Sequence, residues 1–379
     1  MNKELRRGLR TWIEIDKKAI AHNYQIFRNL IDKKCKLMAV VKSNAYGHNL
    51  LEFAKELQKL GVDYLAVDSI VEGIALRKEG IKKPILVLGY TLPEMLEEAI
   101  KYNIEIAVSN FETLKEIEKL KTSSKKIKTH IKIDTGMNRH GFLLSEKEKL
   151  LADLKKAKNI SVVGLFTHFA MAKNPAFPQY TKNQIAEFEK WSESFNKNGF
   201  NPIRHASATS GAILFKEAHF DMVRIGIGLY GIWPSSETRA FAEGKIKLAP
   251  VLSWKAVIGE VKAIKAGSRV GYDCTETVTK DTKIGIIPVG YWHGLPRALS
   301  SIGKIIIGNK KCKILGRVCM DIIMVDISDV KNVKVGDEVV IIGKSGKVEI
   351  TADEVSNIID CSTYELLTRI NPLIKRFYI

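Results

Sequence analysis

From residue 37 to about residue 230 the chain alternates between short apolar runs and longer amphipathic stretches. Strands buried on both faces of a sheet are apolar throughout, and regular alternation with helices indicates a parallel sheet. Eight such units are the number that closes a (β/α)8 barrel of the TIM type, so we predict this α/β fold. The predicted strands are Leu37–Val41, Tyr64–Val67, Ile85–Leu88, Ile104–Val108, His130–Ile133, Val162–Phe166, Ile203–His205 and Met222–Ile225. The predicted helices include Asn49–Leu60, Glu94–Tyr102, Phe111–Leu120 and Lys182–Asn198.

The pattern changes after about residue 240, where helical periodicity fades and short apolar runs are separated by Gly, Asn and Asp. This pattern predicts a mainly antiparallel β domain. We expect Thr11–Ile15 to join it, because a closed barrel has no free edge. The expected organisation is an N-terminal strand in residues 1–16, a barrel in 17–240 and a C-terminal β domain in 241–379. The predicted strands of that domain are Val257–Val261, Ile284–Val289, Lys304–Ile307, Lys313–Leu315, Ile322–Val325 and Glu338–Ile342.

Composition places the chain among globular proteins of the cytoplasm. Of its 379 residues, 45% are hydrophobic, yet no apolar run approaches the roughly 20 residues that span a bilayer. The first residues are charged and precede no apolar stretch, which is unlike a signal peptide. The five cysteines are odd in number and include no C-x-x-C pair, so we expect reduced thiols and neither a disulfide framework nor a metal site. They are Cys35, Cys274, Cys312, Cys319 and Cys361.

The net charge of +18 raises the alternative of nucleic-acid binding. The excess is mostly Lys, spread along predicted helix faces at positions such as Lys115, Lys119 and Lys121. Arg, which reads phosphates and bases better, is sparse, and no nucleic-acid motif accompanies the charge. We therefore expect neither a nucleic-acid partner nor a membrane partner.

Side chains that can act as acids, bases or nucleophiles lie at the ends of the predicted barrel strands. The carboxyl ends of the strands are where barrel enzymes have their active sites. The first strand ends in Lys42, the fifth carries Lys132 and Asp134, the sixth ends at His168, and the eighth carries Arg224. Hydroxyl and glycine residues follow the seventh and eighth strands. This set of residue types is suited to binding a phosphorylated aldehyde cofactor.

Each of these residues also has an ordinary explanation. A Lys at a strand end is usually a solvated cation, but Lys42 follows the apolar run Met38–Val41, so its base should be buried. His168 alone would more often be structural, and Arg224 alone would more often be an ion-pair partner. The run Gly226–Gly231 fits a dinucleotide fingerprint, but it follows the last strand rather than the first and lacks the matching acidic residue. Its glycines can still bring backbone N–H groups close to a phosphate.

The chain resembles the alanine racemase family of fold-type III pyridoxal 5'-phosphate (PLP) enzymes. The stretch Ala39–His48 is similar to the family's PLP-lysine signature, and the resemblance extends over nearly the whole chain. Further matching segments are Lys132–Met137, Thr167–Ala170, Val223–Gly226, Val270–Tyr272, Val289–Tyr291, Gly316–Asp321 and Tyr364. The resemblance implies interconversion of L- and D-alanine, which supplies D-alanine for peptidoglycan.

The resemblance also implies a role for each catalytic and substrate-binding residue. Lys42 carries PLP and is the base on the D-alanine side, whereas Tyr272 is the base on the L-alanine side. Arg139 and the backbone at Met320 bind the substrate carboxylate. Because Tyr272 comes from the partner subunit in this family, the resemblance implies a homodimer with shared active sites.

The remaining implied roles concern the cofactor. Arg224 lies against the pyridine nitrogen, and His168 packs near the cofactor and supports Tyr272. Lys132 is expected to be carbamylated, which turns a repelling cation into an anion that holds Arg139; the alternative is an ordinary Lys132 paired with Asp134. The residues implied to hold the cofactor phosphate are Tyr46, Ser207, Gly226, Ile227 and Tyr364.

Two bases suit racemisation, because the α-proton must leave one face and return to the other. A free Tyr has a pKa near ~10, so nearby positive charge must lower the pKa of Tyr272. Arg224 cannot accept a proton, so a carbanion is less delocalised into the ring than an Asp there would allow. We infer that this limits side reactions such as transamination.

The chain departs from the family pattern at four positions and leaves three alternatives open. Asn138 stands where Gly is common, Ala206 where many relatives have Asn, Asp273 where Gly is frequent, and His293 where Asp is frequent. None removes a catalytic group, but they leave open a racemase for serine or lysine. A fold-type III decarboxylase usually has a carboxylate at the pyridine nitrogen, which Arg224 argues against. A PLP-binding homeostasis protein would be a single barrel without the β domain.

Overall fold

The structure is a computed structural model that describes residue 4, residues 6–121 and residues 125–379. The chain separates into two compact units. One, which we call the barrel unit, comprises Lys18–Ala45 and Leu50–Ala249. The other, which we call the β unit, comprises the chain up to Lys17, the short segment Tyr46–Asn49, and Pro250–Ile379. Within the described ranges, no helix is long and apolar enough to cross a membrane.

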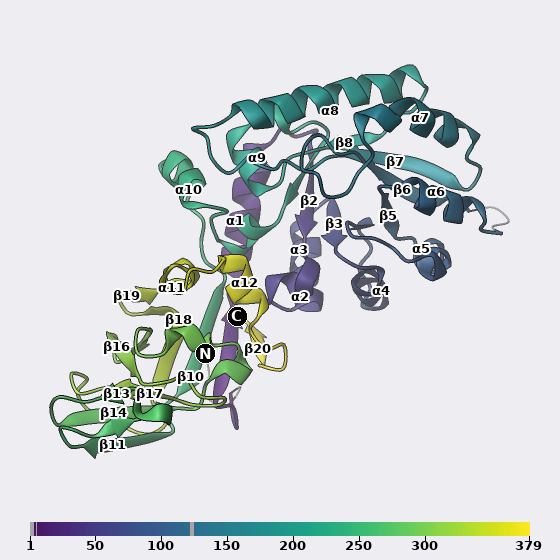
Figure 1. The fold of residues 1–379 in the computed structure, drawn as a ribbon. Helices are drawn as coiled ribbons and strands as arrows, with labels where there is room; N and C mark the ends of the chain where they lie inside the picture. Colours follow the sequence, from purple (N-terminus) through teal and green to yellow (C-terminus); the bar gives the residue numbers. More distant parts are fainter. Residues whose placement is uncertain (1–3, 5, 122–124) are drawn as a thin grey trace. The chain divides into compact units, whose positions relative to one another are not determined.

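The barrel unit contains eight parallel strands in the order β8-β7-β6-β5-β4-β3-β2-β9 (Figure 1). The two ends of this order meet through backbone hydrogen bonds, from Asp221 N to Arg204 O (3.1 Å) and from Arg224 N to Ser207 O (2.9 Å). The prediction of a (β/α)8 barrel is therefore confirmed. The strands are β2 Lys36–Val40, β3 Tyr64–Val67, β4 Ile85–Val87, β5 Glu105–Val108, β6 Ile127–Lys132, β7 Ile160–Phe166, β8 Ile203–His205 and β9 Met222–Ile225.

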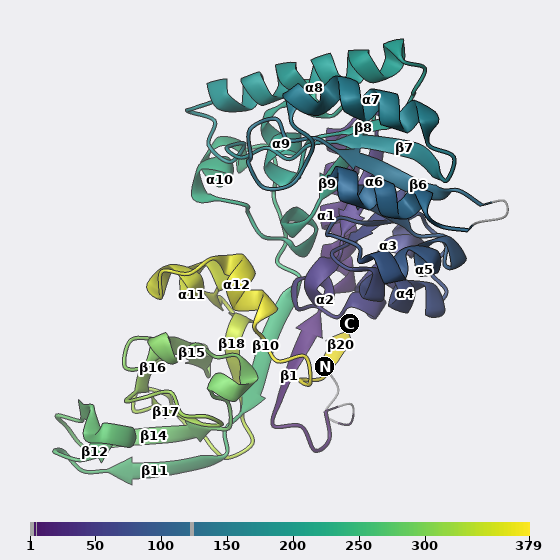
Figure 2. The ribbon, with the colours of Figure 1, turned by 45° about the vertical axis from the view of Figure 1, so that its right-hand side comes forward.

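Helices cover the outside of these strands, and Figure 2 shows the long helix α8 running across β7 and β8. Short polar residues begin several of them: the side chain of Ser69 accepts from Glu72 N, and that of Asn110 accepts from Thr113 N. The helices are α1 Lys17–Leu30, α2 Lys42–Tyr46, α3 Leu50–Leu60, α4 Ile70–Lys78, α5 Leu96–Lys101, α6 Phe111–Glu118, α7 Lys147–Lys156, α8 Gln179–Lys197, α9 Thr209–Leu214 and α10 Ser236–Ala242. Short 3-10 turns are η1 Pro93–Met95, η2 Leu144–Glu146, η3 Lys216–Ala218 and η4 Ile227–Tyr230.

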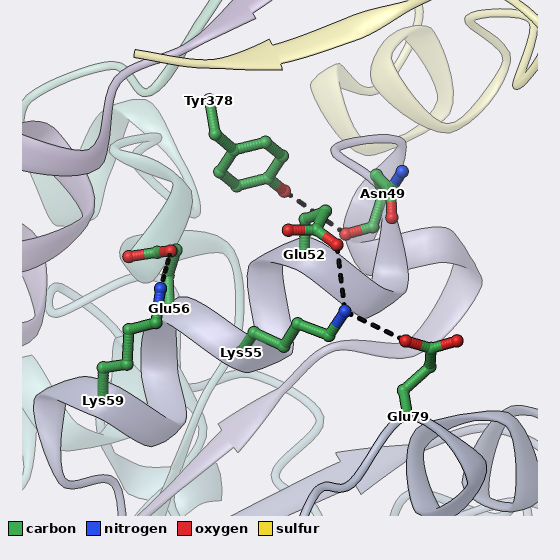
Figure 3. A network of polar contacts seen from close by, with 7 residues as sticks. All are labelled: Asn49, Glu52, Lys55, Glu56, Lys59, Glu79 and Tyr378. Atoms are coloured by element: carbon green, nitrogen blue, oxygen red, sulfur yellow. Dashed lines mark hydrogen bonds and ion pairs between the residues drawn. The ribbon is translucent and has the colours of Figure 1, made fainter.

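On the surface, an ion-pair network joins helix α3 to the end of α4 (Figure 3). The Lys55 ammonium lies 3.1 Å from a Glu52 oxygen and 2.9 Å from a Glu79 oxygen. Because exposed pairs are solvated and screened, each contributes only roughly 0–1 kcal/mol. The network therefore adds little to the stability, most of which comes from the buried faces of the strands and helices.

The β unit is built on a sheet in the order β11-β14-β17-β16-β15-β18-β10-β1-β20, with β19 paired to β18. The N-terminal strand β1 pairs antiparallel with β10 and parallel with β20, as expected for a strand that joins this sheet. The strands are β1 Thr11–Ile15, β10 Leu252–Val257, β11 Glu260–Ile264, β12 Arg269–Val270, β13 Glu276–Thr277, β14 Thr282–Ile287, β15 Lys304–Ile307, β16 Lys310–Leu315, β17 Ile323–Asp326, β18 Glu338–Ser345, β19 Val348–Ile350 and β20 Arg376–Tyr378. The helices and turns are α11 Ala352–Ile358, α12 Thr363–Thr368, η5 Tyr272–Cys274, η6 Tyr291–His293 and η7 Arg297–Leu299.

One predicted strand was wrong. The run Val257–Val261 contains the end of β10 and the start of β11, separated by Ile258 and Gly259. At this break Ile258 N donates to Asp337 O and Gly259 N donates to Ile286 O, so the two residues pair with different segments. Gly259, followed by Glu260, is a turn signal within the run that the predicted strand did not take into account.

The segment Tyr46–Asn49 belongs to the β unit although it follows the first barrel strand in the chain. The Arg376 guanidinium donates to Gly47 O (3.0 Å), and the Tyr378 hydroxyl donates to His48 O (2.8 Å) and Asn49 O (3.3 Å; Figure 3). Gly47 has a φ of +86°, and a Cβ there would collide with the backbone carbonyl of Leu367. The final strand thus fixes the path of the chain at residues 47–49.

Inside the barrel, a missing side chain makes room for a large polar one. His130 on β6 pairs in register with Gly164 on β7, next to a register shift between Thr129 and His130. His130 is fully buried, and a Cβ built on Gly164 would collide with its imidazole ring. A histidine fits inside the barrel at position 130 because the residue paired with it, Gly164, has no side chain.

We predict that Gly164→Ala lowers the free energy of unfolding by ~1–3 kcal/mol or more, because overpacking forces the buried ring to move. Gly244→Ala is the matched control, since a Cβ there meets nothing within 4 Å. Urea unfolding of both variants measures the difference. Equal stability of the two variants would contradict the packing of His130 against Gly164.

Candidate functional site

Lys42 follows β2 and Val41 at the carboxyl end of the strand. Val41 is fully buried, whereas the Lys42 side chain is 38% exposed, so burial is confirmed for the start of this turn and only in part for the amine. The Lys42 Nζ lies 3.2 Å from Asp68 Oδ1. The amine is therefore held at the strand end by an exposed carboxylate and remains accessible to a small molecule.

The residues after Lys42 form a left-handed turn. Ser43, Asn44 and Ala45 have φ values of 56°, 55° and 51°, and Tyr46 has a φ of 50°. Left-handed backbone costs an L-residue ~1–2 kcal/mol, and such strain concentrates at functional sites. Glu72 accepts from Asn44 N (3.2 Å), while the Asn44 side chain accepts from Leu50 N (2.9 Å). These bonds hold the turn that separates Lys42 from Tyr46.

Arg224 on β9 is buried, and both of its Nη atoms have several acceptors. Its guanidinium donates to the carbonyls of Thr167 (2.8 Å), His205 (2.9 Å) and Ala206 (2.8 Å). It also meets the Nδ1 atoms of His205 (2.9 Å) and His168 (3.2 Å). Burial lowers the pKa of Arg224 to about 9, so the group stays cationic at neutral pH. All of these acceptors are neutral groups, so they do not support the ordinary explanation of Arg224 as an ion-pair partner.

His168 lies just beyond β7 and is neutral. Burial, then the positive charges of Arg224, Arg139, Lys132 and Lys42, lower the pKa of His168 to about 3. Because Arg224 can only donate, the His168 Nδ1 must accept and its proton sits on Nε2. His168 can therefore offer an N–H donor to another group.

Lys132 and Asp134 lie near each other in sequence but have different partners. Burial, then the charges of Arg139 and Arg224, lower the pKa of Lys132 to about 8. Asp134 instead accepts from the backbone of Gly136, Met137 and Arg139 (2.8, 2.8 and 3.0 Å), which folds the loop that presents Arg139. In the described chain no ion pair joins Lys132 to Asp134, so the alternative of a simple pair is not supported.

In addition to the predicted Ser207, the structure shows a threonine that contacts the glycine loop after β9. Ser207 is fully buried, and its hydroxyl donates to Ala218 O (2.8 Å). Thr209 Oγ1 instead accepts from Gly226 N (3.2 Å) and Gly228 N (3.4 Å). Because the Thr209 hydroxyl accepts both of these hydrogen bonds, it can still donate its own hydrogen to an anion. The Ser207 hydroxyl already donates its hydrogen to Ala218 O. The signal missed in the sequence is Thr209 itself, the first residue of α9.

The β unit contributes the remaining candidates. Tyr46 and Tyr364 have ring centroids 6.0 Å apart, and burial raises the pKa of Tyr364 to about 12, so its hydroxyl stays protonated. Tyr272 and Met320 are exposed on this unit, at 70% and 55%. The unit therefore presents a buried tyrosine, Tyr46, next to a partly buried one, Tyr364, and one exposed phenol, Tyr272.

Comparison with known proteins decides the family. Residues 15–234 match the model of the alanine racemase N-terminal domain, and residues 251–378 match that of the C-terminal domain. The chain belongs to the alanine racemase family. The alanine racemase of Symbiobacterium thermophilum is 38% identical over 374 residues, covering 98% of both chains. The alanine racemase of Halothermothrix orenii is 37% identical, covering 100% of this chain and 98% of the relative.

Solved structures of alanine racemases agree. That of Clostridium difficile has a TM-score of 0.92 at 35% identity and covers 98% of this chain and 96% of that one. The Bacillus anthracis enzyme with bound L-Ala-P has a TM-score of 0.91 at 32% identity, with coverages of 98% and 95%. Both barrel and β unit are thus those of an alanine racemase.

Two departures from the alanine racemase pattern have a backbone explanation. Asn138 and Asp273 have φ values of 55° and 59°, a region in which Gly, Asn and Asp are the most easily accommodated residues. The Asp273 carboxylate also lies 2.8 Å from Arg317 Nε. His293 is buried and accepts from Gly290 N (3.2 Å). These three residues therefore keep the local conformation; nothing in the structure explains Ala206.

The donor set of this chain fits PLP. In the barrel unit, the Gly228 position has no room for a Cβ, because one would collide with Phe27 and lie 2.8 Å from Thr209 Cγ2. The backbone N–H groups of this loop and the Thr209 hydroxyl are suitable donors for a phosphate. Among the described residues, no group of three or more His, Cys, Asp or Glu side chains could hold a metal ion.

We predict that Thr209→Val weakens PLP binding about tenfold or more, because a hydrogen bond to a charged group is worth ~1.5–3 kcal/mol. Ser207→Ala is the matched control, because its hydroxyl already serves Ala218, and its PLP affinity should stay within about twofold. Fluorescence titration of the PLP-free variants measures both affinities. The opposite ranking would restore Ser207 as the phosphate ligand.

Proposed function

We propose that this chain is a PLP-dependent alanine racemase that interconverts L- and D-alanine and so supplies D-alanine for peptidoglycan. The observation that carries the proposal is Arg224, a buried cation with neutral acceptors at the carboxyl ends of the barrel strands. A guanidinium is too weak an acid to transfer its proton to the nitrogen of a cofactor ring. It therefore limits how far negative charge moves into that ring. This favours returning the α-proton over the transamination or decarboxylation that a ring-nitrogen carboxylate supports.

When bound, PLP makes the α-proton of an amino acid acidic by withdrawing electrons from the α-carbon. The chain's own residues then hold and move that proton. Lys42 is the proposed cofactor lysine and the base on the D-alanine side, because its amine is accessible beside Asp68. Tyr272 is the proposed base on the L-alanine side, and the Nε2–H of neutral His168 is a suitable donor to support its phenolate.

The substrate carboxylate and the cofactor phosphate need separate cationic or polar partners. Arg139, whose loop is folded by Asp134, and the backbone at Met320 are proposed for the carboxylate. Tyr364 is a neutral phenol and is proposed for the phosphate, together with Tyr46, Thr209, Gly226 and Ile227.

We propose a homodimer with shared active sites, in which Tyr272 and Met320 of one chain complete the site of the other. Both side chains are exposed in the single chain, at 70% and 55%. A catalytic phenol left in water has no positive charge nearby to activate it, so we propose that cationic groups of the second copy supply that charge. The cytoplasmic location inferred from the sequence stays a prediction.

The second candidate function is a racemase of broader specificity, because Ala206 has no structural explanation and differs from many relatives. The chain should racemise L-alanine at least about tenfold faster, by kcat/KM, than L-serine or L-lysine, since one extra group in a small pocket costs ~1–3 kcal/mol. Polarimetry or chiral chromatography with PLP-loaded enzyme measures the panel. A preference for serine or lysine would favour the broader enzyme, and carbon dioxide release from lysine would indicate a decarboxylase.

Carbamylation of Lys132 is also proposed. A neutral amine is needed to attack carbon dioxide, which forms an N–C bond and releases one proton. The lowered pKa of Lys132, about 8, makes a neutral amine available near neutral pH. The product is an anion close to Arg139 and Arg224, in place of a third cation.

With 13C-bicarbonate we expect a carbamate carbon signal that grows from pH 7 to pH 9, because the neutral fraction of Lys132 rises through its pKa of about 8. Lys132→Gln should abolish this signal. Lys42 needs its own control: the signal should persist in PLP-loaded protein, where Lys42 is occupied. A signal that survives Lys132→Gln would place the carbamate elsewhere.

A further inference from the structure

A chain of buried polar side chains crosses the barrel interior from Arg224 and ends at a carboxylate. Arg224 Nη1 lies 2.9 Å from His205 Nδ1, His205 Nε2 lies 2.8 Å from His130 Nδ1, and His130 Nε2 lies 2.8 Å from Glu105 Oε2. The four residues come from β9, β8, β6 and β5, and they are between 0% and 4% exposed. None of the sequence motifs includes Glu105 or His130.

The hydrogen bonds that link these four side chains allow only one arrangement of the protons. Arg224 can only donate, so His205 Nδ1 accepts. Burial and the charge of Arg224 hold the pKa of His205 well below its usual range, so the ring has a single proton, which is on Nε2. His130 Nδ1 must then accept, and its own Nε2 proton points to Glu105. Every donor therefore points away from Arg224 and towards the carboxylate.

The packing around the rings fixes this arrangement. His205 stacks on Phe166 with centroids 4.9 Å apart and planes 4° apart, and His130 meets Tyr64 edge-on at 6.3 Å. Gly164 leaves the space that His130 fills. The negative charge of Glu105 contributes, after burial, to a raised pKa of Tyr64, so this phenol stays neutral beside the chain. Neither ring can flip without losing a buried hydrogen bond on both sides.

We propose that His205, His130 and Glu105 are positioning residues for Arg224: their relay of hydrogen bonds fixes the guanidinium and carries the charge of Glu105 towards it. A carboxylate that accepts from His130 makes its Nδ1 a stronger acceptor, and the same polarisation passes through His205. The inference deepens the proposed function and rests on it, because Arg224 is taken to face the ring nitrogen of PLP. The relay then sets both the position and the donor strength of that guanidinium.

Glu105→Gln tests the relay, since it keeps the shape and an acceptor oxygen but removes the charge. Glu14→Gln is the matched control, because Glu14 is equally buried (6% against 4% exposed) but bonds to Trp12 and Lys255 in the β unit. The first readout is nitrogen NMR of histidine- and arginine-labelled protein without PLP. We expect neutral His130 and His205 rings protonated on Nε2, and shifts of both rings and of the Arg224 side chain in Glu105→Gln but not in Glu14→Gln.

The second readout uses PLP-loaded enzyme. Glu105→Gln should lower kcat for alanine about tenfold, equivalent to about 1.4 kcal/mol, with KM within about twofold, because Arg224 does not bind the substrate. It should also shift the pH midpoint of the cofactor absorption band. Glu105→Asp, which restores a charge on a shorter arm, should recover part of kcat.

The outcomes separate the relay from simpler roles. Lost stability in Glu105→Gln with unchanged His205 and Arg224 signals would overturn the proposal and leave a purely structural core. Shifted His205 and Arg224 signals in a protein that racemises no amino acid would keep the relay and refute the proposed function. If Glu105→Gln fails to fold, the nitrogen NMR spectrum of the unmodified protein tests the relay. A proton on Nδ1 of His130 or of His205 would exclude it.

Discussion

The buried guanidinium of Arg224 is the constraint on which the site depends. A cation removed from water is costly unless hydrogen bonds replace its hydration, and here three carbonyls and two imidazole nitrogens do so. The carbonyls of Thr167, His205 and Ala206 come from the ends of neighbouring strands, so satisfying Arg224 also fixes where these strands end. Burial, together with the charge of this cation, lowers the pKa values of the adjacent His168 and His205 and keeps both rings neutral. One side chain thereby helps to set both the geometry and the protonation at the carboxyl ends of these strands.

Much of the fold follows from the sequence pattern. The eight barrel strands were predictable because a strand buried on both faces must be apolar, and the observed bounds differ by few residues. The break in Val257–Val261 coincides with Gly259, but the change of partner depends on Asp337 and Ile286, which are distant in the sequence. The grouping of Tyr46–Asn49 with the β unit lacks a local signal, since it depends on Arg376 and Tyr378 more than 300 residues later.

The site was predictable where residues belong to motifs and unpredictable where closure of the barrel brings them together. Lys42, His168 and Arg224 lie at strand ends, as their places in the chain required. Choosing between Ser207 and Thr209 needs the direction of two hydroxyls, which sequence spacing does not give. Glu105 and His130 each interrupt an apolar strand, and only the closed barrel shows that they meet.

The central claim is that two bases on different units serve opposite faces of the same carbon, with Tyr272 on the L-alanine side. Tyr272→Phe deletes one oxygen from an exposed side chain, so the fold and PLP binding should survive. Exchange of the α-proton with solvent deuterium, followed by NMR for each enantiomer, is the most direct measurement. The account predicts that exchange from L-alanine falls far more than exchange from D-alanine, while racemisation falls in both directions. Equal loss of exchange from both enantiomers, or undiminished racemisation, would contradict it.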